Sequence, residues 1–296
     1  MTFADRLRVL WRLTRPFTLT ASLVPVATGV ALAAAGGAWR PGPAVAFMLA
    51  AMLIQAATNM FNEYFDYRRG LDTHEMVGIA GAIVRDGVSP RTVLALGWIF
   101  AGTAIALGLY ISASSSWWVF ATGLACIGVA YLYSAGPVPL AYTPFGELVA
   151  GTMMGPVIVL LVYFVMAGVL SPVALAVSVP IGLLIGSILM ANNLRDLDQD
   201  IKGGRRTLAI RLGRRGASRV LAGVFAAAYV IVAVLAAMGS VSAWALLVVA
   251  AVPLGVKAAQ GFFRFGKPVE LVPAFKATSM QLLAFGALLV TGLLLG

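Results

Sequence analysis

The 296-residue chain has little charge, one cysteine and one histidine. Only 11% of its residues are charged, against about a quarter in a typical soluble domain, and the mean hydropathy is +0.95. This composition excludes a soluble globular protein and an intrinsically disordered one. A single cysteine, Cys126, also excludes an internal disulfide framework, and we interpret it as a small buried apolar side chain.

Acidic residues are the scarcer charge, with 11 Asp and Glu against 21 Lys and Arg, which leaves a net charge of +10. In a soluble protein such an excess would point to nucleic acid as a partner. Here the basic residues gather in alternate segments between long apolar runs, as the positive-inside rule requires of an inner-membrane protein. We therefore predict the lipid bilayer as a partner and no nucleic acid, and we leave the oligomeric state open.

Apolar windows long enough to cross about 30 Å of hydrocarbon as helix recur along the chain. They predict nine transmembrane helices, at 17–36, 43–64, 91–112, 116–134, 145–168, 172–192, 217–238, 240–260 and 271–295. No linker separates them, so we predict a single transmembrane domain over residues 1–296. The basic segments place the N-terminus in the cytoplasm and the C-terminus outside, in a multi-pass protein of the cell inner (plasma) membrane.

The few carboxylates are concentrated at the predicted cytoplasmic ends of two helices. Asn62 is followed four residues later by Asp66, and the same spacing links Asn192, Asp196 and Asp200. Because residues four apart share one face of a helix, each helix is predicted to end in a column of oxygen ligands. Carboxylate and amide oxygens are hard ligands that suit Mg²⁺, whose coordination a substrate's phosphates can complete.

Basic residues interleave with these acids and complete the predicted site. They are Arg68, Arg69, Arg195, Lys202, Arg205 and Arg206. Guanidinium and ammonium groups neutralise phosphate oxygens, so a diphosphate held between metal and bases is chemically coherent. For each single base, a salt bridge or a topology signal is an alternative interpretation.

The two acidic stretches resemble the UbiA superfamily of intramembrane aromatic prenyltransferases. Residues 59–72 (NMFNEYFDYRRGLD) are similar to the family's first aspartate-rich motif and 192–208 (NNLRDLDQDIKGGRRTL) to its second. Three more segments, 15–18 (RPFT), 81–90 (GAIVRDGVSP) and 133–147 (YSAGPVPLAYTPFGE), are similar to the branch that prenylates 1,4-dihydroxy-2-naphthoate in menaquinone synthesis.

The resemblance implies an all-α integral membrane fold, a ring of nine helices around a central cavity with cytoplasmic cap loops. It implies that Mg²⁺ is the cofactor and that its ligands are Asn62, Asp66, Asp72, Asp196 and Asp200, of which Asp66 and Asp196 are the catalytic residues. It places the diphosphate on Asn192, Arg69, Arg195, Lys202 and Arg206, and the aromatic acceptor on Arg15 and Tyr142.

The function implied is Mg²⁺-dependent transfer of a polyprenyl group from polyprenyl diphosphate to the naphthoate, with decarboxylation. Glu63 stands where the first motif often has Asp, and Val138 where many relatives have Lys or Arg. Other acceptors therefore remain alternatives: 4-hydroxybenzoate, homogentisate, a porphyrin or a lipid phosphate. An alternative of another class is an ion-coupled secondary transporter, but its acids would lie near mid-membrane rather than at helix ends.

Overall fold

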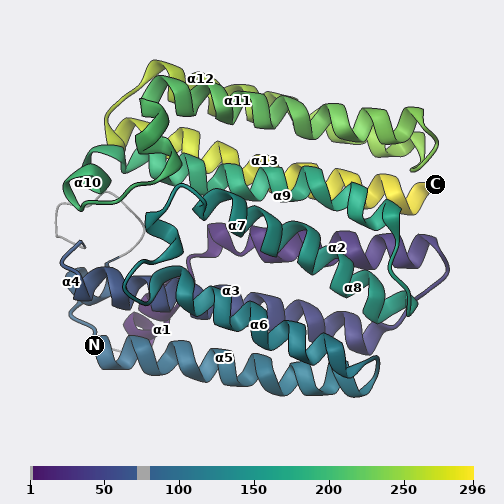
Figure 1. The fold of residues 1–296 in the computed structure, drawn as a ribbon, viewed down its shortest axis with the longest axis horizontal. Coiled ribbons are helices and arrows are strands. Elements are labelled where there is room, and N and C mark those ends of the chain that lie inside the picture. Colours follow the sequence, from purple (N-terminus) through teal and green to yellow (C-terminus); the bar gives the residue numbers. More distant parts are fainter. Residues whose placement is uncertain (1–2, 72–80) are drawn as a thin grey trace.

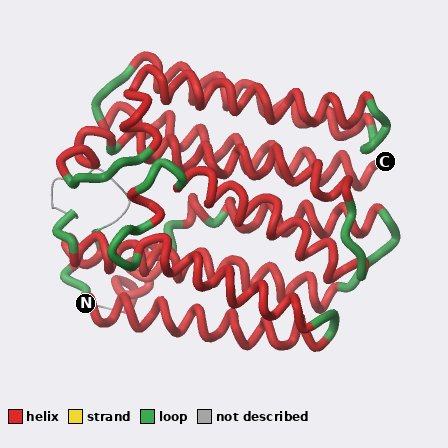
Figure 2. The backbone as a smooth tube through the Cα atoms, in the orientation of Figure 1, coloured by secondary structure: helices red, strands yellow, loops and turns green. Residues whose placement is uncertain are grey.

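The computed structural model describes residues 3–71 and 81–296, and every regular element in this part of the chain is a helix (Figure 2). The long helices are α2 (Thr20–Ala35), α3 (Pro41–Arg68), α5 (Pro90–Ala113), α6 (Trp117–Ser134), α9 (Pro172–Arg195), α11 (Leu208–Ala237) and α13 (Pro268–Leu295). The shorter pieces are α1 (Phe3–Leu13), η1 (Pro16–Thr18), α4 (Ala82–Asp86), η2 (Leu140–Tyr142), α7 (Gly146–Thr152), η3 (Met153–Val157), α8 (Ile158–Ala167), α10 (Leu197–Lys202), η4 (Ala243–Ala251) and α12 (Val252–Arg264).

Eight helical segments in the described part are long and apolar enough to cross a membrane. A ninth crossing results if the bent pair Leu7–Thr18 and Thr20–Ala35, which turns by 57°, is taken as one span. The prediction of an all-helical membrane bundle is confirmed, with several boundaries close to those expected, such as Pro90–Ala113 for the window 91–112.

Proline sets where several of these helices begin. Pro41, Pro90, Pro172 and Pro268 each occupy the first turn of a long helix. The first turn has no intrahelical partner for its N–H groups, so a residue without an N–H costs nothing there, and its fixed φ favours the helix. These prolines therefore indicate where the helices begin, independently of hydropathy.

The long helices run side by side, and the first and last of them are neighbours, so the bundle closes on itself (Figure 1). Helix α2 packs against α3, α8 and α13, while α9 packs against α7, α11 and α13. The two ends of the chain lie at opposite ends of the bundle, and α1, α4 and α10 gather at the end where the chain begins (Figure 1). We call this the motif end.

Small residues bring α7 and α9 into close contact. A Cβ added to Gly155 would lie 2.4 Å from the Cα of Gly182, and one added to Gly151 would lie 2.6 Å from the Gly182 carbonyl oxygen. Gly151 and Gly155 are four residues apart, a spacing of small residues that is common where membrane helices pack closely. Gly155 belongs to the π-helical turn η3, which also contains Pro156, whose missing N–H leaves the regular helix interrupted.

The segment between the sixth and seventh spans corrects the sequence-based prediction. The window 217–238 begins nine residues later than α11, whose first part carries Arg211, Arg214 and Arg215 outside the predicted spans. A kink at Gly213 (φ 67°, ψ 166°) divides α11, so a short helical piece precedes the long one, which begins close to the predicted window. The side chain of Thr207 caps the short piece by accepting a hydrogen bond from the Ile210 N–H, at 3.4 Å.

Arg40, at the opposite end from the motifs, ties two helix ends together. Its guanidinium donates to the carbonyl oxygens of Ser114 (2.5 Å) and Val165 (2.9 Å), near the C-termini of α5 and α8. Carbonyls in the last turn of a helix lack intrahelical partners.

We expect Arg40→Met to lower the melting temperature in detergent by about 4 °C, from a loss of about 2 kcal/mol. Arg40→Lys, which keeps the charge but not the fork, should fall between; an unchanged melting temperature in Arg40→Met would contradict this role.

Candidate functional site

The last turns of α3 carry the first acidic motif. Asp66 is 9% exposed, and each of its carboxylate oxygens has a partner from a distant part of the chain. The Tyr142 hydroxyl donates to one oxygen at 2.8 Å, and the Arg205 guanidinium donates to the other at 3.0 Å. Asp66 therefore joins α3 to η2 and to the segment that follows α10.

Arg205 also reaches the second acidic motif. Its other terminal nitrogen lies 3.2 Å from a carboxylate oxygen of Asp200, which is 5% exposed. One guanidinium thus holds a carboxylate from each motif, although the two aspartates are far apart in sequence. The other carboxylate oxygen of Asp200 is buried and has no hydrogen-bond partner among the described residues.

The titration behaviour of this cluster follows from burial. Loss of water raises the pKa of the Asp200 carboxyl to about 7, although the charge of Arg205 opposes this shift. Burial, reinforced by the neighbouring charge of Asp66, raises the pKa of Tyr142 to about 12, so this hydroxyl stays protonated and donates.

The second motif is not the continuous column that its spacing predicted. Helix α9 ends at Arg195, and Asp196 (φ −95°, ψ 9°) separates it from α10. The Asp196 carboxylate accepts two hydrogen bonds from the Arg195 guanidinium, at 2.8 and 2.6 Å, and the same guanidinium donates to the Asn192 side-chain oxygen at 2.8 Å. These three predicted residues form a second cluster, and the charge of Asp196 is close enough to raise the pKa of Asp200.

Other predicted residues lie around these two clusters. Asn62 accepts a hydrogen bond from the Ser134 hydroxyl at 3.3 Å. Arg69 donates to the carbonyl oxygens of Ser134 (2.7 Å) and Gly136 (3.0 Å), so it fixes the loop after α6. The Tyr142 ring lies between two guanidinium groups, 5.1 Å from that of Arg69 and 4.5 Å from that of Arg205.

The remaining predictions have mixed outcomes. Lys202 and Arg206 are exposed beside the clusters, and the Arg206 N–H donates to the Tyr142 carbonyl at 2.8 Å. Asp72 lies outside the described residues. Val138 is 72% exposed in the loop before η2. Among the described residues no group of three or more acidic, histidine or cysteine side chains is arranged to hold a metal ion, because Arg205 lies between Asp66 and Asp200.

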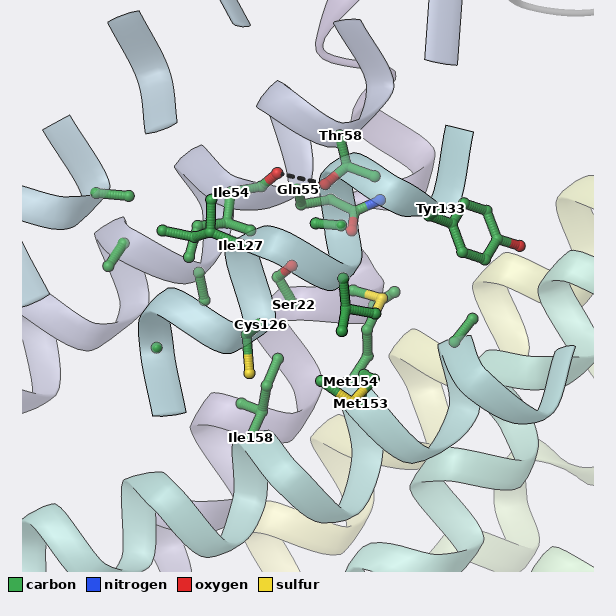
Figure 3. A pocket seen from close by; sticks show the side chains of 18 of the residues that line it. Ser22, Ile54, Gln55, Thr58, Cys126, Ile127, Tyr133, Met153, Met154 and Ile158 are labelled. Atoms are coloured by element: carbon green, nitrogen blue, oxygen red, sulfur yellow. Dashed lines mark hydrogen bonds between the residues drawn. The ribbon is translucent and has the colours of Figure 1, made fainter. Parts of the chain in front are cut away.

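An apolar cavity of about 290 Å³ begins beside these clusters and extends into the bundle. Its polar lining includes Arg15, Asn59, Asn62, Tyr133 and Asn192. Figure 3 shows side chains from several elements around it, among them Ser22 of α2, Gln55 of α3, Cys126 of α6, Met154 of η3 and Ile158 of α8. The cavity can hold an apolar chain with its polar end at the clusters.

Sequence reasoning named Arg205 among the basic residues of the site but did not predict that it joins the two motifs. Its position, five residues after Asp200, gives no helical relation to the acids, because a turn with Gly204 at φ 71° lies between them. That left-handed turn, favoured by glycine, brings the Arg205 N–H to the Asp200 carbonyl at 3.0 Å and folds the side chain back over the motif. The paired glycines at 203 and 204 were the available signal.

Acidic clusters at the helix ends, basic partners and an apolar cavity together define a membrane-embedded site for an apolar molecule with an anionic head. Residues 22–293 match the model of the UbiA prenyltransferase family. The chain belongs to this family and is a prenyltransferase.

Relatives of known activity cover nearly the whole chain. The 1,4-dihydroxy-2-naphthoate octaprenyltransferase of Bacillus subtilis (strain 168) is 46% identical over 288 residues, 97% of this chain and 93% of the relative. The protein of the same name from Mycobacterium tuberculosis is 34% identical over 284 residues, 95% and 94% of the two chains. These relatives are similar along the spans as well as the motifs.

Solved structures share the fold. The apo structure of a UbiA homolog from Aeropyrum pernix K1 aligns with a TM-score of 0.70 at 16% identity, over 93% of this chain and 97% of that one. A UbiA homolog from Archaeoglobus fulgidus bound to GPP and Mg²⁺ aligns with a TM-score of 0.63 at 19% identity, over 96% and 99%. At these identities the likeness establishes the architecture alone.

Proposed function

We propose that this chain transfers a polyprenyl group from polyprenyl diphosphate to 1,4-dihydroxy-2-naphthoate, with loss of the carboxylate as CO₂, in menaquinone biosynthesis. The observation that carries the proposal is the convergence of Asp66 and Asp200 on Arg205, one helical turn beyond Asn62, which lines an apolar cavity. The naphthoate enters from the names of the relatives in B. subtilis and M. tuberculosis.

The side chains of the site, rather than their present arrangement around Arg205, fit a magnesium ion. Asp200 has a buried carboxylate oxygen with no hydrogen-bond partner among the described residues, and Asp66 and Asn62 of α3 add hard oxygens. Asp66, Asp200 and Asn62 would hold the ion, with Asp196 and Asp72 as the further ligands predicted from the sequence. When bound, Mg²⁺ supplies positive charge that stabilises the leaving diphosphate.

The basic side chains act on the diphosphate itself. Arg205 already lies between the two motifs, and Arg195 and Asn192 form a donor pair beside the cavity. Arg69, Lys202 and Arg206 contribute further positive charge at the same end. Such charges stabilise the leaving group more than the bound ester, because the negative charge grows as the C–O bond breaks.

The chemistry balances without an added base. The C–O bond between the allylic carbon and the diphosphate breaks, and its electron pair leaves with the diphosphate. The naphthoate ring then forms the new C–C bond at the carbon that bears the carboxylate. Cleavage of the bond to that carboxylate returns an electron pair to the ring and releases CO₂. The apolar cavity excludes water, which would otherwise capture the allylic cation.

Arg15 and Tyr142 are proposed to place the acceptor. Arg15 lines the cavity beside Asn62 and is positively charged, which suits a carboxylate. The Tyr142 hydroxyl donates to Asp66, which supports a role for Tyr142 between the proposed diphosphate site and the acceptor ring. The motif end is proposed to face the cytoplasm, as the basic segments indicate, with the C-terminus outside.

Competition between acceptors tests the proposed substrate. Purified protein receives one polyprenyl diphosphate, Mg²⁺ and equal concentrations of 1,4-dihydroxy-2-naphthoate, 4-hydroxybenzoate and homogentisate. We expect more than nine-tenths of the prenylated product to derive from the naphthoate, by mass spectrometry, because a site discriminates strongly by its buried polar contacts. Predominant prenylation of either other acid would reassign the acceptor.

The single cysteine provides a native probe of the cavity. We expect polyprenyl diphosphate with Mg²⁺ to slow alkylation of Cys126 by a small membrane-permeant maleimide at least fivefold, because the prenyl chain occupies the space that this thiol lines. The rate is followed by intact-protein mass spectrometry. Inorganic diphosphate with Mg²⁺ is the matched control; equal protection by both would place the prenyl chain elsewhere.

A further inference from the structure

The last turns of α3 present a second pair of polar side chains beside the acidic motif. Asn59 and Glu63 are four residues apart and therefore share one face, offset from the face of Asn62 and Asp66. They are 6% and 2% exposed, more buried than Asp66. Neither has a role in the magnesium site proposed above.

Both side chains hold the turn that contains Arg15. The Asn59 amide donates to the Thr14 carbonyl oxygen at 2.9 Å and to the Thr18 hydroxyl oxygen at 3.0 Å. A carboxylate oxygen of Glu63 accepts from the Arg15 guanidinium at 3.5 Å. The Thr18 hydroxyl in turn donates to the Arg15 carbonyl oxygen at 2.8 Å, so the turn is held from both sides.

Arg15 is the one described residue other than glycine with a positive φ, at 49°. A left-handed backbone is unfavourable for an arginine, and such strain persists only where its surroundings impose it. Arg15 lines the cavity, and among the described residues its guanidinium donates a single hydrogen bond, to Glu63. Its other donors therefore remain available to an anion in the cavity.

A glutamate at position 63 can hold both Arg15 and the start of α4, whereas a glutamine could not accept from all of these donors. Both of its oxygens accept from the Gly81 N–H, at 2.9 and 3.0 Å, and one also accepts from the Ile83 N–H at 3.3 Å. A carboxylate only accepts hydrogen bonds, whereas one end of a glutamine would point an NH₂ group at these donors or at Arg15. The longer side chain at this motif position thus reaches α4 and Arg15 together.

We propose that Asn59 and Glu63 are positioning residues that hold Arg15 in its left-handed turn so that its guanidinium pairs with the carboxylate of the acceptor. The inference rests on the proposed function, and it makes the pair Asn59 and Glu63 a determinant of acceptor specificity. Their substitution changes which acceptor is used more than it changes the use of the prenyl donor.

The test compares two acceptors that differ only in the carboxylate, 1,4-dihydroxy-2-naphthoate and 1,4-dihydroxynaphthalene. Each is assayed with the full-length protein, Mg²⁺ and geranylgeranyl diphosphate, and the ratio of the two kcat/KM values is taken on one preparation, so any unfolded fraction cancels. We expect the wild type to favour the carboxylated acceptor at least thirtyfold, as expected for a charge-assisted contact. Glu63→Gln and Asn59→Leu should lower this ratio at least tenfold, with the KM of the donor within twofold.

Two matched variants separate positioning from folding. Glu63→Asp keeps the charge and should retain most of the preference. Asp86→Asn removes the side-chain pair between α4 and Arg12 but leaves the Arg15 guanidinium and its partner Glu63 in place, and it should leave the ratio unchanged. A ratio that survives in Glu63→Gln, or that falls equally in Asp86→Asn, would overturn the inference. A wild type that used neither acceptor would overturn the proposed function, and the inference with it.

Discussion

Asp66→Asn is expected to lower kcat at least a thousandfold and to leave the protein folded in detergent. The change removes the charge proposed to bind the metal, and it replaces one of the two oxygens that accept hydrogen bonds from Tyr142 and Arg205 with an NH₂ donor. Turnover is measured with saturating donor and acceptor, and folding by thermal unfolding. Asp196→Asn should likewise abolish transfer.

The control for both variants is Asp198→Asn, which makes the same change of functional group two residues after Asp196. The Asp198 side chain is 69% exposed and lies 3.3 Å from Arg214, outside both clusters. We expect this variant to keep its activity within twofold. Near-wild-type turnover in both Asp66→Asn and Asp196→Asn would contradict the assignment of the metal and the diphosphate to this site.

Arg205→Gln is expected to have the second largest effect, because one guanidinium compensates two buried carboxylates. Removing one partner of a buried ion pair costs about 3 kcal/mol or more. In the absence of divalent ions we expect a clear fall in the melting temperature, and Mg²⁺ should restore more of it than it adds to the wild type. Turnover should fall about a hundredfold, through the lost charge on the diphosphate.

Arg211→Gln is the matched control for the Arg205 variant, since its side chain is exposed on α11 and the change in net charge is the same. It should melt like the wild type with and without Mg²⁺. If Arg205→Gln gained no additional stabilisation from Mg²⁺, the metal would not bind between Asp66 and Asp200.

The membrane spans could be predicted because their signal is local. A helix of the length of α5 needs only its own run of apolar residues and the proline at its start. The short piece before the kink at Gly213 in α11 was missed for the same reason, because it begins at a cap on Thr207 and has no apolar run long enough to cross the bilayer. The bend before α2 depends on the backbone of Arg15, which no composition window detects.

The acidic residues of the site were predictable because helical spacing aligned Asn62 with Asp66. The break at Asp196 was not, and it separates Asp196 and Asp200 into two clusters. Partners between distant segments were also not predictable, such as the hydrogen bond from Tyr142 to Asp66 and the return of Arg205 across its glycine turn. The partners of Glu63 could not be predicted either, because they depend on the position of α4, which the sequence alone does not determine.

The most direct measurement of the central claim uses the purified wild-type protein, a polyprenyl diphosphate and 1,4-dihydroxy-2-naphthoate, with Mg²⁺ or with EDTA. Mass spectrometry follows the aromatic product. We predict a prenylated naphthoquinol that lacks the carboxyl group, formed with Mg²⁺ and absent with EDTA. No prenylated product with Mg²⁺, or equal product in EDTA, would contradict metal-assisted prenyl transfer at the Asp66, Asp200 and Arg205 cluster.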